Sequence, residues 1–75
     1  MQRSVLHGGF ILRCVRKHRG LTQDELSQLI GVSGRTYGRW EAKETEPEFS
    51  MVCSICSDIL KLSIFEAWQI AEASL

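Results

Sequence analysis

Residues 22–42 read TQDELSQLIGVSGRTYGRWEA, and this stretch decides the fold. Thr22, followed three residues later by Glu25, is a capping box: each side chain accepts a hydrogen bond from the backbone N–H of the other residue, which predicts the start of a helix. Gly31 tolerates the positive φ that ends this helix, and Ser33 is a good N-cap for a second one. The stretch therefore predicts two short helices joined by a tight turn.

Two helices joined in this way cross at a steep angle, and the crossing places its own demands on the sequence. A small side chain must face the partner helix where the two approach most closely, and Ser27 supplies it. Apolar side chains must hold the angle, and the motif offers Leu26, Ile30 and Val32 against Tyr37 and Trp40. Leu29 completes the apolar face of the first of the two helices. We therefore predict a helix-turn-helix motif over residues 22–42.

The rest of the chain is expected to form three more helices and no strands, because the alternation typical of strands is absent. These helices are expected over residues 10–18, before a capping Gly20, over 49–60, with an apolar stripe of Phe49, Val52, Ile55, Cys56 and Ile59, and over 63–73, where Ser63 and Glu66 form a second capping box. Residues 1–8 are left as an N-terminal extension. The prediction is a single all-α domain, residues 1–75, of five short helices.

Length and composition set limits on the class of protein. Seventy-five residues bury too little surface for a β-sandwich or a two-domain enzyme, and no apolar run is long enough to span a bilayer. The N-terminus lacks the apolar stretch of a secretory signal, and three cysteines are an odd number, too sparse for a disulfide scaffold. We therefore expect a cytoplasmic protein without a membrane partner.

The charges are unevenly distributed although the net charge is zero. Residues 1–43 carry eight lysines and arginines against three acidic residues, a net charge of +5, whereas residues 44–75 carry one lysine against six acidic residues, a net charge of −5. Such a split is typical of a protein with one face that meets nucleic acid. Two ordinary solvated surfaces would give the same split, so charge alone leaves both interpretations open.

The stretch LTQDELSQLIGVSGRTYGRWEAKETEP, residues 21–47, resembles the phage-repressor (Cro/XRE-like) helix-turn-helix family, and the resemblance extends over about residues 12–68. It implies a lambda-repressor-like domain of five helices, the third of which lies in the major groove of duplex DNA. It also implies a transcriptional regulator, most simply a repressor of phage or mobile-element type. Such a regulator binds a palindromic operator as a homodimer.

The resemblance further implies roles for individual residues. Gln23 would hold a phosphate at the start of the second helix, and Arg16 would pair with Glu41. The positions that read bases fall on Ser33, Gly34, Arg35, Thr36 and Arg39.

Two departures from the family pattern concern the loop after the third helix and the length of the fourth. Family members often have glycine after the glutamate that ends the third helix, whereas residues 41–46 read EAKETE. Lys43 is a candidate phosphate contact, but the glutamates around it would repel a phosphate. The interval from Pro47 to Ser63 is one residue longer than usual, which affects the end of the fourth helix.

Arg35 and Arg39 have side chains suited to base recognition. They are four residues apart, hence on one face of the helix, and that face lies opposite Tyr37 and Trp40. A guanidinium contacts O6 and N7 of guanine in a bidentate manner, which gives about 1–3 kcal/mol of discrimination. The two glycines of this helix are poor helix formers, and we expect them to let its backbone approach the groove or a phosphate closely.

The cysteines and histidines allow a different interpretation, a small zinc-binding domain. Cys53 and Cys56 form a C-x-x-C, but a structural zinc needs four ligands, and only Cys14, His7 and His18 remain to complete a site. We favour cysteines packed in the core and surface histidines, and predict no metal, cofactor or small-molecule ligand. Cys14 and His18 lack a third group to orient a nucleophile, so we predict that the protein is not an enzyme.

The last helix is more apolar than one buried face requires, with Ile64, Phe65, Trp68, Ile70 and Ala71. Trp68 is expected to cover the core, and the remaining apolar surface is a candidate homodimer interface. A monomer with a fully buried last helix is the alternative. For function, the alternative to DNA binding is a protein-interaction module of the same fold, antirepressor-like or antitoxin-like.

Overall fold

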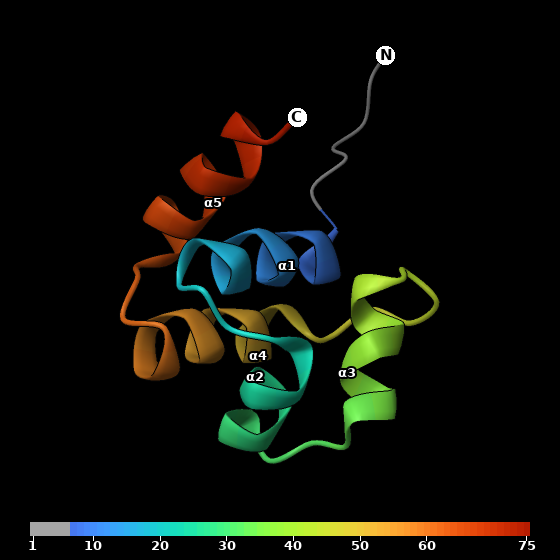
Figure 1. The fold of residues 1–75 in the computed structure, drawn as a ribbon. Coiled ribbons are helices and arrows are strands. Elements are labelled where there is room, and N and C mark those ends of the chain that lie inside the picture. The colour runs from blue at the N-terminus through green and yellow to red at the C-terminus, as the bar shows by residue number, and fades with distance from the viewer. Residues whose placement is uncertain (1–6) are drawn as a thin grey trace.

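A computed structural model describes residues 7–75, and residues 1–6 of the predicted N-terminal extension lie outside this range. The described residues form α1 (Gly8–His18), α2 (Gln23–Ile30), α3 (Gly34–Glu41), α4 (Phe49–Ser54), the π-helix η1 (Ile55–Ile59) and α5 (Ile64–Ala73). The prediction of an all-α, five-helix fold is confirmed. In Figure 1, α1 runs through the middle of the molecule, with α5 above it, α4 below it, and α2 and α3 at the lower end.

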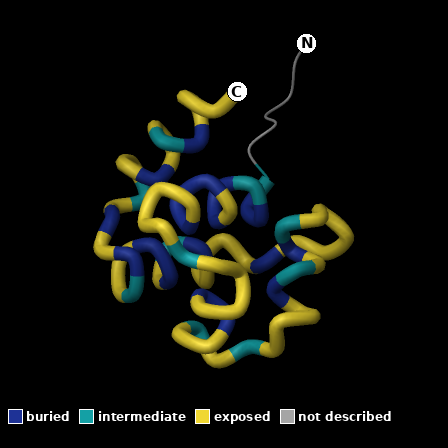
Figure 2. Tube along the Cα trace, viewed as in Figure 1, coloured by how far each residue is buried: buried dark blue, intermediate teal, exposed yellow. Residues whose placement is uncertain are grey.

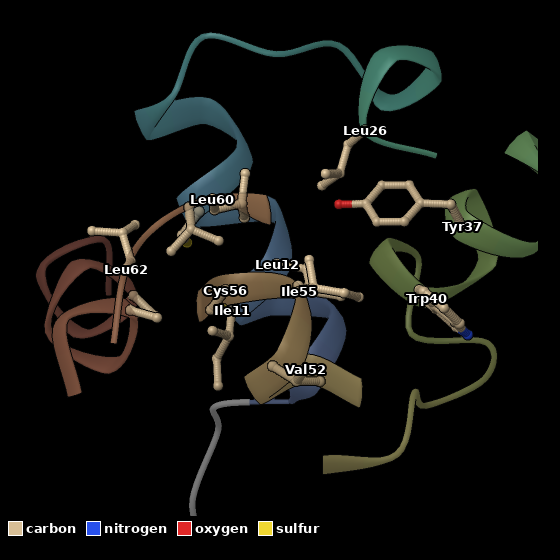
Figure 3. Close-up of a cluster of buried hydrophobic side chains, with 14 residues drawn as sticks. Ile11, Leu12, Leu26, Tyr37, Trp40, Val52, Ile55, Cys56, Leu60 and Leu62 are labelled. Carbon is tan, nitrogen blue, oxygen red and sulfur yellow. The ribbon is translucent and has the colours of Figure 1, made fainter. Parts of the chain in front are cut away.

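The core is one cluster of apolar side chains to which every helix contributes. It consists of Ile11, Leu12, Cys14, Val15, Leu26, Tyr37, Trp40, Val52, Ile55, Cys56, Leu60, Leu62, Ala67 and Ala71 (Figure 3). Leu26 of α2 and Tyr37 of α3 are fully buried and point toward one another. Removing such side chains from water stabilises the fold by about 1.5–3 kcal/mol each, so this pair holds both helices of the motif against the core.

The helix-turn-helix forms by the local interactions expected from the sequence. Thr22 Oγ1 accepts from the Glu25 backbone N–H at 3.0 Å, and Glu25 Oε1 accepts from the Thr22 backbone N–H at 2.8 Å. Gly31 ends α2 with a φ of 92°. Ser33 Oγ accepts from the backbone N–H three residues later at 3.0 Å and caps α3. The predicted caps and turn are confirmed.

The fourth predicted helix is not a continuous α-helix. α4 ends at Ser54 and the chain continues into η1, where the Leu60 N–H donates to the carbonyl of Ile55, five residues back, at 3.0 Å. A π-helical turn closes over one residue more than an α-helical turn. The turn lies within the interval from Pro47 to Ser63, for which the family resemblance predicts one additional residue.

α1 begins at Gly8, two residues before the predicted Phe10, because His7 caps it. His7 Nδ1 accepts from the Gly9 backbone N–H at 2.9 Å, and its Nε2 lies 3.8 Å from a carboxylate oxygen of Glu46. His7 is partly exposed, and its capping role was not predicted: the ring takes the place of the serine or aspartate that usually accepts from a first-turn N–H.

α1 and α3 approach each other most closely at Gly9. A Cβ added there would overlap the backbone carbonyl oxygen of Trp40 and lie 2.5 Å from its carbonyl carbon. Only a residue without Cβ permits this crossing. The role of Gly9 was not predicted from the sequence, because the contact joins segments about thirty residues apart.

Three apolar side chains that the spacing assigned to the core are exposed instead. Leu29 of α2 is 59% exposed, Phe49 of α4 is 65% exposed and Trp68 of α5 is 37% exposed. The spacing is helical, but these positions face solvent in the folded chain. Exposed residues follow the outer turns of α2 and α3 (Figure 2). In α5 the small side chains of Ala67 and Ala71 cover the core in place of Trp68.

None of the helices between residues 7 and 75 has the length and apolar character needed to cross a membrane.

Candidate nucleic-acid interface

α3 has two different faces. Tyr37 and Trp40 are buried in the core, with ring centroids 5.8 Å apart in a T-shaped arrangement. Arg35, Thr36 and Arg39 are exposed, as the helical spacing predicts. One face therefore fixes α3 in the protein, and the other is available to a ligand.

The carboxylate of Glu41 joins three helices. It accepts from Arg16 Nε at 2.7 Å and from Arg16 Nη2 at 3.0 Å, so the ion pair expected between these two residues is present and bidentate. Tyr37 Oη donates to Glu41 at 2.5 Å and Gln23 Nε2 donates to it at 2.9 Å. Because Arg16 lies on α1 and Gln23 on α2, this one carboxylate at the end of α3 fixes α3 relative to both helices.

Burial and hydrogen bonding act on Glu41 in opposite directions. Its side chain is 4% exposed, and burial by itself raises the pKa of a carboxyl group. The hydrogen bonds from Arg16, Tyr37 and Gln23 outweigh burial, so the pKa of Glu41 is lowered below its ordinary value. The hydrogen bond to Glu41 raises the pKa of Arg16. Burial, followed by the hydrogen bond to Glu41, raises the pKa of Tyr37.

Gln23 lies in the first turn of α2 with its side chain against α3. Its Nε2 donates one hydrogen to Glu41, and a second hydrogen remains for another acceptor. A Cβ on Gly38 would lie 3.7 Å from Gln23 Oε1, and a Cβ on Gly34 would lie 3.1 Å from Asp24 Oδ1. Both glycines of α3 thus face α2, which gives them a role in helix packing that the sequence did not indicate.

A Schellman motif closes the end of α3. The Lys43 N–H donates to the carbonyl of Trp40 at 3.1 Å, and the Glu44 N–H donates to the carbonyl of Arg39 at 3.0 Å. Lys43 has a φ of 66°, a left-handed conformation that glycine adopts readily and other residues adopt at a cost. The departure from the family pattern after Glu41 thus lies at the position where glycine is preferred.

The side chains of this loop make contacts within the protein. Lys43 Nζ lies 5.6 Å from the centroid of the Phe10 ring, a cation–π arrangement. Arg39 Nε donates to Glu44 Oε1 at 3.3 Å, and both side chains are more than half exposed. Arg35 has no side-chain partner among residues 7–75. The two candidate base-reading arginines therefore differ, since only Arg39 is held by a neighbour.

Two of the three cysteines, Cys14 and Cys56, are buried in the core, and Cys53 is half-buried. Burial, with a smaller contribution from Cys53, raises the pKa of Cys56 to about 11, so this side chain is a thiol at neutral pH. In the described part of the chain, no three His, Cys, Asp or Glu side chains gather as metal ligands would.

Helical spacing predicts that Tyr37 packs in the core, but its hydroxyl was not predicted to be a partner of Glu41. A signal was present, because a buried tyrosine hydroxyl usually finds a hydrogen-bond partner. Glu41 lies four residues later, on the same face of the helix. The amide of Gln23 gave no such signal, because its contact with Glu41 depends on how α2 and α3 cross.

Comparisons with known proteins agree with this geometry. A family model described as helix-turn-helix, of the Cro/C1 (XRE) type, matches residues 12–59, which is well over half of the chain and includes the whole motif. No curated protein and no solved structure matches the chain. The family consists of DNA-binding transcription regulators and not of enzymes. The chain therefore belongs to the Cro/C1-type helix-turn-helix family and is a regulator that binds double-stranded DNA.

Proposed function

We propose that the chain is a sequence-specific repressor that places α3 in the major groove of an operator. The division of α3 into a packed face and an exposed face with Arg35, Thr36 and Arg39 carries this proposal. The major groove admits an α-helix, and arginine is the side chain that most often recognises guanine there. Because Glu41 fixes α3 to its neighbours, a rigid unit presents this face. A protein bound at a promoter would block transcription, so repression is the simplest regulatory effect.

We further propose that the N-terminus of α2 binds a backbone phosphate. The first N–H groups of a helix lack partners within it and carry partial positive charge. Gln23 begins α2, and one hydrogen of its amide has no acceptor among residues 7–75. Ser33 and Gly34, at the start of α3, remain candidates for base reading. Lys43 would have to leave the ring of Phe10 to reach a phosphate.

Two copies are proposed to bind together through α5. Phe65 is 79% exposed, and Trp68, which is partly exposed, follows it one turn later. Large apolar side chains exposed side by side on a small protein are typical of a contact with another protein. A two-fold dimer presents two copies of α3 to half-sites about 34 Å apart.

Selection of bound duplexes from random DNA, followed by sequencing, tests base reading. We expect one recurring palindromic sequence, and an affinity that falls with salt at a log–log slope of about −0.9 per phosphate contact. Arg35→Ala and Arg39→Ala should each relax the preference at one position by about 1–3 kcal/mol, whereas Gln23→Ala should weaken all duplexes alike. A protein that prefers no duplex contradicts the proposal and favours the protein-interaction module.

Analytical ultracentrifugation tests the dimer. Phe65→Glu should sediment as a monomer and bind a single half-site. Leu29→Glu is the matched control, because Leu29 is similarly exposed but lies on α2. A Phe65→Glu variant that sediments as the wild type does would show that α5 is not the interface.

A further inference from the structure

The loop that follows α3 returns to a candidate base-reading arginine. The backbone N–H of Glu44 donates to the carbonyl of Arg39 at 3.0 Å, and its Oε1 accepts from Arg39 Nε at 3.3 Å. The left-handed φ of Lys43 turns the chain back so that both contacts form. A backbone contact and a side-chain contact therefore join the same two residues, and the Schellman motif sets where the carboxylate lies.

The contact leaves one edge of the guanidinium free. Arginine has five N–H donors, one on Nε and four on the two Nη atoms. Glu44 accepts from Nε, and neither Nη atom of Arg39 has an acceptor among residues 7–75. The two Nη atoms can together donate the parallel pair of hydrogen bonds that guanine O6 and N7 accept. Arg35 lacks a comparable partner in this part of the chain, so only Arg39 is oriented before DNA binds.

We propose that Glu44 is a positioning residue that holds Arg39 with its Nη edge free for a guanine, and so raises the discrimination at that base pair. This role rests on the proposed function, in which Arg39 reads a base. A side chain that is ordered before binding loses less entropy when the contact forms. The charge of Glu44 also repels backbone phosphate, so the residue lowers the affinity for every duplex while it raises the preference for one.

Three variants separate these two effects. Glu44→Ala removes the charge and the acceptor, and Glu44→Gln removes the charge but keeps an acceptor oxygen. Glu46→Ala is the matched control, because Glu46 carries the same charge in the same loop but lies beside His7 and not beside Arg39. Fluorescence anisotropy with the selected duplex, and with duplexes altered at each base pair, measures both affinity and discrimination. Arg39→Ala identifies the base pair that Arg39 reads.

We expect Glu44→Ala, Glu44→Gln and Glu46→Ala, which each remove one negative charge, to bind every duplex more tightly. Only Glu44→Ala should markedly reduce the preference at the base pair of Arg39, by about two- to fivefold, as expected for an exposed ion pair. Glu44→Gln should keep more of it. A Glu44→Ala variant that behaves like Glu46→Ala overturns the positioning role but leaves base reading intact. If Arg39→Ala changes no base preference, Arg39 does not read a base and the positioning role fails, whereas a wild-type protein that prefers no duplex overturns the proposed function itself.

Nuclear magnetic resonance relaxation of the arginine Nε–Hε groups gives a second readout, without DNA. Glu44→Ala should increase the picosecond–nanosecond motion of the Arg39 side chain and leave that of Arg35 unchanged. Circular dichroism checks that the variant remains folded. An Arg39 side chain that is equally mobile in the wild type and in Glu44→Ala overturns the proposal.

Discussion

Replacement of Gly9 by alanine should separate α1 from α3 and destabilise the protein, although alanine is the better helix former. The new Cβ would overlap the carbonyl oxygen of Trp40, lie 2.5 Å from its carbonyl carbon and lie 3.2 Å from the backbone nitrogen of Glu41. All three atoms belong to the backbone of α3, so no side-chain rotation relieves the overlap. Because ordinary contact begins near 3.4 Å, the carbonyl carbon alone requires the helices to separate by about 1 Å, and the overlapping oxygen requires more.

Two opposing contributions set the size of the effect. Alanine improves the helix propensity by up to about 1 kcal/mol. Overpacking costs about 1–3 kcal/mol and more where backbone has to move, and separating the helices also lengthens the contact between Arg16 and Glu41. We expect the free energy of unfolding to fall by about 2–3 kcal/mol, out of about 4–11 kcal/mol for a chain of 75 residues. The melting temperature should fall by about 10–20 °C.

Gly38→Ala is the matched control for Gly9→Ala. Its Cβ would lie in ordinary contact, 3.7 Å from Gln23 Oε1, in the interior of α3. The better helix propensity should then raise the free energy of unfolding by about 0.5–1 kcal/mol. Urea unfolding followed by circular dichroism measures both variants. If Gly9→Ala is as stable as the wild type, or if Gly38→Ala loses as much as Gly9→Ala, a backbone contact does not fix the crossing.

Three further predictions concern buried polar groups. Because the pKa of Glu41 is lowered in the folded chain, its ionised form stabilises the fold above the ordinary carboxyl pKa, and this stability is lost as the pH falls through the lowered pKa. Glu41→Gln should therefore reduce the loss of unfolding free energy at acidic pH, and an unchanged acid dependence would contradict this. Arg16→Met leaves the carboxylate without its cation and should cost about 3–5 kcal/mol in urea unfolding, whereas a loss below about 1 kcal/mol would show that Tyr37 and Gln23 suffice. Cys56, buried and with a pKa of about 11, should react with a thiol reagent only when the chain unfolds, and rapid labelling seen by mass spectrometry would contradict its burial.

Features that depend on neighbouring residues in the chain could be predicted from the sequence. The caps at Thr22 and Ser63 and the left-handed Gly31 each involve atoms within a few residues, so the pattern alone specifies them. The exposed stripe of Arg35 and Arg39 follows in the same way from helical spacing. The motif and the all-α fold could therefore be predicted from the sequence alone.

Features that depend on segments far apart in the chain could not be predicted from the sequence. The exposure of Trp68 depends on which face of α5 packs on the core, where Ala67 and Ala71 lie, and the role of Gly9 depends on the path of α3. The sequence predicted one additional residue after Pro47 but not the π-helical turn, because periodicity does not show which turn of a helix will widen. In the candidate site, the ion pair of Arg16 and Glu41 came from the family resemblance, but the two further donors to that carboxylate did not.

The two faces of α3 have a consequence for how such a protein changes over time. The interactions that hold α3 in place come from Tyr37, Trp40 and Glu41, and the exposed stripe adds nothing to the core. Surface substitutions of this kind usually alter stability by no more than about 0.5 kcal/mol. If this stripe reads bases, as proposed, selection can redirect the protein to a new operator one side chain at a time, without any compensating change in the interior.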